Sequence, residues 1–153
     1  MSFAVRPANL SDIDWLLGQL ASFSEMFGTR LSLFGASEEY KRAALSAVIE
    51  KHVLLIAESE VDGPVGFICG TLTPHFFNPK IAVLQELFWW VDPVHRSGRA
   101  GMMLLKEFIS QGKQLADWVM FSLLAGSPVD GKTLEKYGFK FREQSFILET
   151  ELS

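Results

Sequence analysis

The stretch Trp90-Val-Asp-Pro-Val-His-Arg96-Ser-Gly98-Arg99-Ala-Gly101-Met-Met-Leu-Leu105 joins an apolar strand to an apolar-periodic helix through a turn rich in Arg and Gly. Glycines let a ligand approach the main chain, and a helix N-terminus supplies unpaired N–H donors and the positive end of a dipole. Arg96 and Arg99 flank the turn and suit the oxygens of a phosphate. The stretch therefore predicts a cradle for a pyrophosphate.

The composition predicts one globular domain over residues 1–153, because 48% of the residues are apolar and 21% are charged. The net charge of −4 argues against a nucleic-acid partner and against an anionic membrane surface. Cys69 is the only cysteine, which excludes an intramolecular disulfide and suits a reducing compartment. The N-terminus lacks a signal-peptide pattern, and no apolar run approaches membrane-spanning length. We therefore expect a cytoplasmic protein without a membrane partner.

Hydrophobic periodicity predicts strands and helices that build one mixed sheet with helices on both faces. The first helix is expected to begin at the N-cap Ser11 with Asp14 completing a capping box, and Ser37 is expected to cap a second helix after a loop over Phe23–Ala36. Further helices are expected over Met102–Leu115 and within Gly126–Lys136. The expected strands are Phe3–Arg6, His52–Ser59, Val65–Leu72, Ile81–Val91, Trp118–Leu124 and Phe139–Glu149.

The segment Val91-Asp-Pro-x-x-Arg96-x-x-x-x-Gly101 resembles the acyl-CoA-binding motif of the GCN5-related N-acetyltransferases, the GNAT family. Three other segments resemble parts of the same family in the same order: the opening Val5–Ala8, the hairpin Gly63–Phe67 and the closing Leu134–Phe139. The resemblance implies an α/β, single-domain GNAT-like fold with a mixed, mostly antiparallel sheet. It also implies acetyl-CoA as the cosubstrate.

The resemblance assigns roles to residues of the strand and of the turn. The backbone of Trp89 and Val91 would pair with the pantetheine amides as an added strand would. The pyrophosphate would contact the turn and helix start, namely Arg96, Ser97, Gly98, Arg99, Ala100, Gly101 and Met102.

Three positions depart from the family pattern. Arg99 stands where the family has a glycine, with Gly98 one residue earlier. Leu134 stands where many members carry a tyrosine general acid, and Tyr137 occupies a position that is usually an apolar packing residue. The sequence therefore identifies no general acid.

Glu86 is the only charged residue between Lys80 and Asp92. Burial raises the pKa of a carboxylate, which suits a general base for an ammonium substrate, acting directly or through water. A glutamate on the fourth strand often has this role in the family that the chain resembles. The alternative is a non-catalytic carboxylate on the open face of the sheet that accepts a hydrogen bond or is simply solvated.

The preferred interpretation is an N-acetyltransferase that moves an acetyl group from acetyl-CoA to a primary amine of a small molecule or peptide. The amine would attack directly in a ternary complex. The alternative is a non-catalytic acyl-CoA-binding module that regulates or binds a partner, and the sequence leaves a homodimer open.

Other motifs carry less weight. Gly126–Thr133 satisfies the Walker A pattern, but its helix would end at Gly138 and only one short strand would follow. His75, in the loop before the fourth strand, suits either acceptor contact or a plain surface loop. No spacing of Cys, His and carboxylates predicts a metal site. Ser122 and Ser127 have no evident His–Asp partners.

Overall fold

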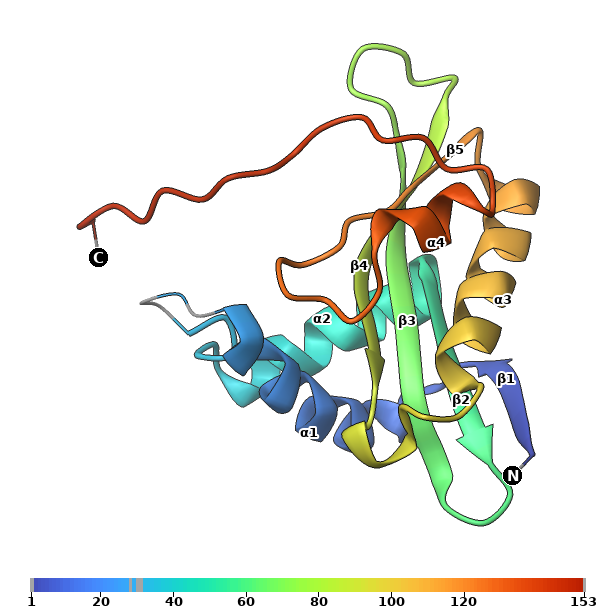
Figure 1. The fold of residues 1–153 in the computed structure, drawn as a ribbon. Helices are drawn as coiled ribbons and strands as arrows, with labels where there is room; N and C mark the ends of the chain where they lie inside the picture. Colours follow the sequence, from blue (N-terminus) through green and yellow to red (C-terminus); the bar gives the residue numbers. More distant parts are fainter. Residues whose placement is uncertain (1, 28, 30–31, 153) are drawn as a thin grey trace. The chain divides into compact units, whose positions relative to one another are not determined.

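Short segments rich in apolar residues form the strands of a twisted sheet in a computed structural model (Figure 1). The structure describes residues 2–27, 29 and 32–152. The strands are β1 (Phe3–Pro7), β2 (Val53–Ser59), β3 (Gly63–Pro74), β4 (Ala82–Val91) and β5 (Trp118–Met120). The helices are α1 (Ile13–Ser24), α2 (Glu38–Lys51), α3 (Ala100–Leu115) and α4 (Gly131–Glu135), with 3₁₀ turns η1 (Leu10–Asp12), η2 (Glu25–Phe27) and η3 (Pro93–His95).

The described residues divide into two compact units, Met1–Phe121 and Ser122–Ser153. One domain over the whole chain, as the composition suggests, stays a prediction. The first unit holds the sheet, whose strands follow the order β1-β2-β3-β4-β5. Neighbours among β1 to β4 pair antiparallel, and β4 pairs with β5 in parallel. The expected mixed, mostly antiparallel sheet is therefore confirmed.

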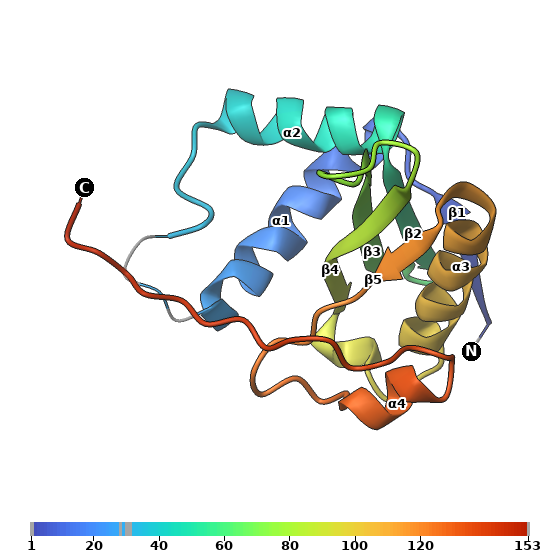
Figure 2. The ribbon, with the colours of Figure 1, turned by 90° about the horizontal axis from the view of Figure 1, so that it is seen from above.

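Helices cover both faces of this sheet: α1 and α2 lie on one face and α3 lies on the other (Figure 2). The core-facing residues of α3 recur at helical spacing, at Leu104, Leu105, Phe108 and Ile109, and all are buried. On β3, the α-carbon of Gly70 approaches the helix so closely that an added Cβ would lie 2.9 Å from Cζ of Phe108. The small residue thus lets α3 pack directly on the middle of the sheet.

The cap that precedes the first helix is not the residue that the sequence predicted. Asn9, not Ser11, is the N-cap of η1: its side-chain oxygen accepts the Ser11 N–H at 2.9 Å, and Asp12, which is itself the N-cap of α1, accepts the Asn9 N–H at 2.8 Å. This capping box starts the 3₁₀ turn that runs into α1. The prediction for Ser11 was wrong because Asn9 and Ser11 have equally suitable side chains and only the backbone path selects between them.

The other boundaries moved less. Ser37 caps α2 as expected, with its hydroxyl accepting the Tyr40 N–H at 3.2 Å. The expected loop over Phe23–Ala36 begins later, because α1 continues to Ser24 and η2 follows. Residues 28, 30 and 31 of that loop lie outside the described residues.

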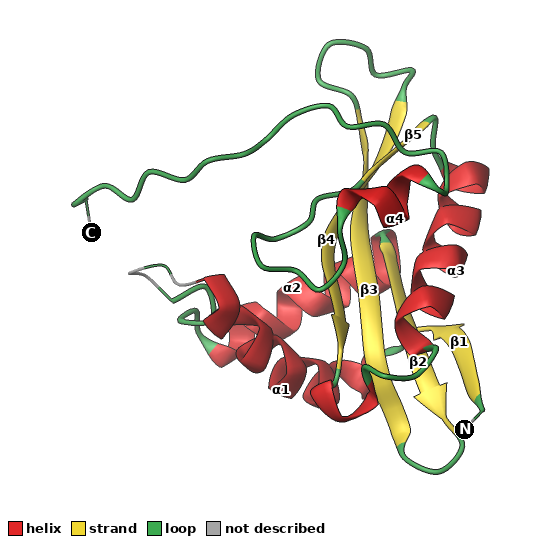
Figure 3. Cartoon of the chain, viewed as in Figure 1, coloured by secondary structure: helices red, strands yellow, loops and turns green. Residues whose placement is uncertain are grey.

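The second unit contains α4 but no strand among its described residues (Figure 3). Asp130 caps α4 by accepting the Thr133 N–H at 3.3 Å, and Gly138 ends the turn with a positive φ of 94°. The predicted strand Phe139–Glu149 is therefore wrong. Phe146 and Leu148 on this segment are 89% and 86% exposed, so its alternating apolar pattern has no sheet surface to cover.

None of the described helices is both long enough and apolar enough to cross a membrane.

Candidate functional site

The strands β4 and β5 are joined at one end and part at the other. Asp117 and Ala82 exchange two hydrogen bonds of 2.8 Å at the closed end, where the Asp117 carboxylate and the Ala82 carbonyl accept. Parallel pairing then covers only Val83–Gln85 of β4. From Phe88 to Val91, β4 pairs with β3 on one side, and the strands of the described chain include no partner for it on the other. This stretch of β4 therefore offers a free edge of backbone N–H and C=O groups.

A β-bulge interrupts β4 at the point where the strands part. Gly70 lies opposite Glu86, whereas its neighbour Cys69 lies opposite Phe88, so Leu87 is the extra residue. A bulge bends its strand and redirects nearby side chains. The strand predicted over Trp118–Leu124 ends at Met120, so β5 is shorter than expected.

The turn after β4 leads straight into α3. The Gly98 N–H donates to the His95 carbonyl at 3.1 Å, and a Cβ on Gly98 would lie 3.3 Å from the ring of Phe3. Arg99 is the N-cap of α3 and makes no side-chain capping hydrogen bond within the described chain. The first helical N–H to donate is that of Met103, to the Arg99 carbonyl at 3.1 Å.

The N–H groups of Ala100, Gly101 and Met102 therefore precede the first helical hydrogen bond, as at any helix N-terminus. α3 begins at Ala100 rather than at the expected Met102, which brings these three residues inside the helix. Together with the helix dipole they form an arrangement that suits an anion. The exposed Ser97 and Arg99 flank it.

Arg96 folds back onto β4. Its Nε donates to the Val91 carbonyl at 2.9 Å, and its guanidinium lies 4.4 Å from the ring centre of Trp90. The stacking side chain holds the turn against the end of the strand. One of the backbone acceptors expected to meet pantetheine, that of Val91, is thus shared with Arg96.

Three of the expected contact residues meet at the start of α3. The indole Nε1 of Trp89 donates to the Gly101 carbonyl at 3.2 Å. A Cβ built on Gly101 would lie 3.5 Å from a methyl group of Val91, which is ordinary van der Waals contact. Neither packing within the chain nor backbone φ therefore requires a glycine at position 101.

Glu86 is buried, with 7% of its surface exposed. Burial raises the pKa of the neighbouring Cys69 thiol, and the charge of Glu86 raises it further, while a backbone hydrogen bond from Phe88 opposes both. Cys69 is therefore held as a neutral thiol and is no candidate nucleophile.

The distance along β4 suits a CoA-sized ligand. Val91 lies five positions after Glu86, which corresponds to about 16 Å of strand, less the length that the bulge removes. The pantetheine arm has about a dozen bonds between its pyrophosphate oxygen and its sulfur, which span roughly 14 Å when extended like a polypeptide. A ligand with its pyrophosphate at the α3 N-terminus would thus bring its thioester near Glu86.

The sequence did not predict the contacts between β4 and α1. Gln19 of α1 accepts the indole N–H of Trp90 at 2.8 Å, and the ring of Phe23 packs edge-on against Phe88 and Trp90, with centroids 5.0 and 5.8 Å away. Helical periodicity places Gln19 and Phe23 on one face of α1, but it does not say which strand that face covers.

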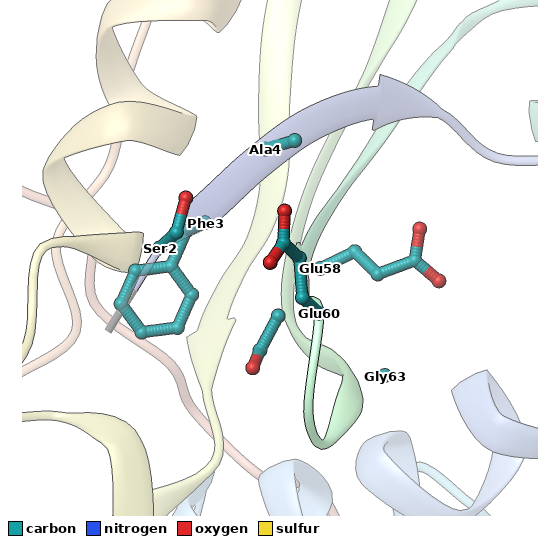
Figure 4. Close-up of a pocket in the computed structure, with 7 residues that line it drawn as sticks. Ser2, Phe3, Ala4, Glu58, Glu60 and Gly63 are labelled. Carbon is teal, nitrogen blue, oxygen red and sulfur yellow. The ribbon is translucent and has the colours of Figure 1, made fainter.

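Two other features do not contribute to this site. A cavity of about 310 Å³ at the start of β1 contains none of the residues predicted for CoA or for catalysis, and its Glu58 is paired with Arg6 (Figure 4). In the Walker-like segment of the second unit, the N–H groups of Ser127, Val129 and Thr133 all donate to local acceptors. These donors are used by the fold itself, which disfavours a phosphate-binding loop there.

No protein-family model and no curated protein matches the sequence. Solved structures match its fold over nearly the whole chain. An acetyltransferase from Trypanosoma brucei has a TM-score of 0.74 at 19% identity, covering 97% of this chain and 100% of that chain.

Two further solved structures carry other descriptions. A transcriptional regulator from Bacillus halodurans C-125 has a TM-score of 0.75 at 15% identity, covering 97% of this chain and 100% of its own. Glucosamine-6-phosphate N-acetyltransferase from Arabidopsis thaliana has a TM-score of 0.69 at 15% identity, covering 99% and 100%.

Identities this low establish likeness of fold. The expected GNAT-like fold is therefore confirmed at the level of architecture, since the chain shares its fold with several structures described as acetyltransferases.

Proposed function

We propose that this chain is an N-acetyltransferase that transfers the acetyl group of acetyl-CoA to a primary amine of a small molecule or peptide. One observation carries the proposal: the last parallel pair of β4 with β5 is Gln85 with Met120, and the stretch Phe88–Val91, which has no partner strand on that side in the described chain, leads to the N-terminus of α3, where no side-chain cap is formed. Similarity of fold to acetyltransferases supports this proposal.

In the proposed complex, the amides of pantetheine pair with the free edge of β4 between Glu86 and Val91. The pyrophosphate lies at the helix N-terminus, within reach of Arg96, Arg99 and the first N–H groups of α3. Holding both reactants in one site lowers the entropic cost of their meeting.

The amine must lose a proton before or during its attack on the thioester. Glu86 is the proposed general base, and its low exposure favours proton transfer through an ordered water. The nitrogen forms the new bond to the acetyl carbon, the C–S bond breaks, and the CoA thiolate then takes a proton from water. A backbone N–H of β4 would stabilise the oxyanion that develops on the thioester.

The acceptor is proposed only as a class, because a shared fold does not specify a substrate. A cytoplasmic location and the absence of nucleic-acid partners likewise stay predictions of the sequence.

The test combines binding with turnover. Calorimetry should detect CoA binding to the full chain, and release of free CoA thiol should follow addition of acetyl-CoA with one member of an amine and peptide panel. CoA binding without thiol release for any acceptor would favour the non-catalytic module instead. No CoA binding, together with tight binding of ATP and Mg²⁺, would refute the proposal.

A further inference from the structure

An aromatic cluster lies on the α3 face of the sheet, where β4 and β5 part. The ring of Trp89 on β4 packs edge-on against Phe121, which directly follows β5, with centroids 5.5 Å apart. Phe121 packs in the same way against Phe108 of α3, with centroids 6.0 Å apart. Both Trp89 and Phe121 pack against the buried core of this face.

This cluster connects the two strands beyond their last parallel pair. That last pair is Gln85 of β4 with Met120 of β5. Continuing the same register would bring Phe121 opposite Glu86, about 10 Å along the strand from Trp89. Instead, the two rings are in direct contact.

The indole of Trp89 also contacts the helix. Its Nε1–H donates to the Gly101 carbonyl in the first turn of α3, at 3.2 Å. One side chain on the free stretch of β4 therefore contacts both the residue that leaves the sheet and the helix start that faces the turn.

We propose that Trp89 is a positioning residue for acyl-CoA. Its ring holds the departing chain at Phe121 away from β4, and its N–H fixes the first turn of α3 relative to the free edge. This inference rests on the proposed function, because Trp89 would fix the distance between the pantetheine site on β4 and the pyrophosphate site at the start of α3. The role belongs to the side chain, whereas the family resemblance pointed only to the backbone of this residue.

The test uses Trp89→Phe, which removes the indole N–H and keeps an aromatic ring. Trp15→Phe is the matched control: Trp15 is also half-buried and packs edge-on against a phenylalanine, Phe67, but on the opposite face of the sheet. Both substitutions remove the same side-chain volume. Only Trp89→Phe also removes an indole hydrogen bond to α3.

The first readout needs no ligand. Amide hydrogen exchange of Met103–Leu105 should become roughly fivefold to tenfold faster in Trp89→Phe, the ratio expected when one hydrogen bond is lost. Exchange of the same amides should be unchanged in Trp15→Phe.

The second readout separates positioning from general destabilisation. In Trp89→Phe the Kd for CoA and the KM for acetyl-CoA should rise by a similar factor, roughly fivefold to tenfold, while kcat at saturation and the acceptor KM stay within about twofold. If Trp89→Phe does not fold, Phe121→Leu, which removes the ring contact and leaves the indole hydrogen bond, is measured in the same way.

The outcomes distinguish a failure of the positioning role of Trp89 from a failure of the proposed function. If wild-type chain binds CoA and Trp89→Phe behaves like Trp15→Phe in exchange and in binding, the role of Trp89 is refuted and the proposed function stands. If wild-type chain does not bind CoA, the proposed function is refuted, and the positioning role is refuted with it.

Discussion

Replacing Arg96 with alanine should weaken CoA binding far more than it weakens the fold. In the free chain the side chain makes one exposed hydrogen bond, to the Val91 carbonyl at 2.9 Å, and one stacking contact with Trp90 at 4.4 Å. Exposed contacts of these two kinds contribute about 0.5–1 kcal/mol each. We therefore expect Arg96→Ala to lower the free energy of unfolding by about 1–2 kcal/mol.

The loss in binding should be larger. A guanidinium that bonds a pyrophosphate oxygen makes a charge-assisted hydrogen bond, which contributes about 1.5–3 kcal/mol. This corresponds to a rise in the Kd for CoA of roughly tenfold to 150-fold. The Val91 carbonyl becomes available to pantetheine in the variant, which should offset a small part of the loss. Isothermal titration calorimetry at fixed salt gives the Kd, and urea unfolding gives the stability.

Arg42→Ala is the control for net charge. Arg42 lies on α2 and pairs with Asp14 at 2.6 Å and with Glu38 at 3.2 Å, so its removal changes the net charge of the chain equally without touching the turn. CoA is an anion, and both variants lose the same long-range attraction. If Arg96→Ala and Arg42→Ala weaken CoA binding to the same extent, Arg96 has no local contact with the ligand and the proposed cradle is wrong.

Three further predictions concern chemistry and stability. Glu86→Gln should lower kcat at least tenfold and leave the Kd for CoA within about twofold, and an unchanged rate across pH would show that Glu86 is not the base. Gly70→Ala should destabilise the fold by about 1–3 kcal/mol, measured by urea unfolding, because the new Cβ would lie 2.6 Å from the Gln85 carbonyl oxygen. The hydrogen bonds from Arg6 hold the pKa of Asp12 below its usual value, so this carboxylate stabilises the fold above about pH 4 and the contribution disappears as the pH falls further. Melting temperatures between pH 2 and 6 should therefore fall less steeply with acid in Asp12→Asn, and parallel curves would contradict this.

Local patterns predicted well those elements that have a buried partner surface in the described fold. β4 reads as a nearly continuous apolar run because β3 and both helix layers cover it, and the long helix after it carries its apolar residues at helical spacing. The turn between them was predicted from Arg96, Gly98 and Gly101, and the structure brings Arg96 to Val91 and Gly101 to Trp89.

Predictions failed where an element depends on a distant partner. The segment Phe139–Glu149 has the composition of a strand, but a strand forms only when another strand takes up its backbone hydrogen bonds, and no ladder forms there. β5 ends at Met120, and the ring of the next residue, Phe121, packs against Trp89 and Phe108, which are both distant from it in the sequence.

The sequence by itself determined the apolar strand, the Arg- and Gly-bearing turn and the helix that follows, because residue spacing and backbone preference are local properties. Only the tertiary structure decided that Phe88–Val91 of β4 has no partner strand on one side in the described chain and that this edge leads to the N-terminus of α3. An unpaired edge is a relation between two strands whose paired residues, such as Val83 and Trp118, lie far apart in the sequence, and no local pattern shows the bulge or the aromatic packing beside it.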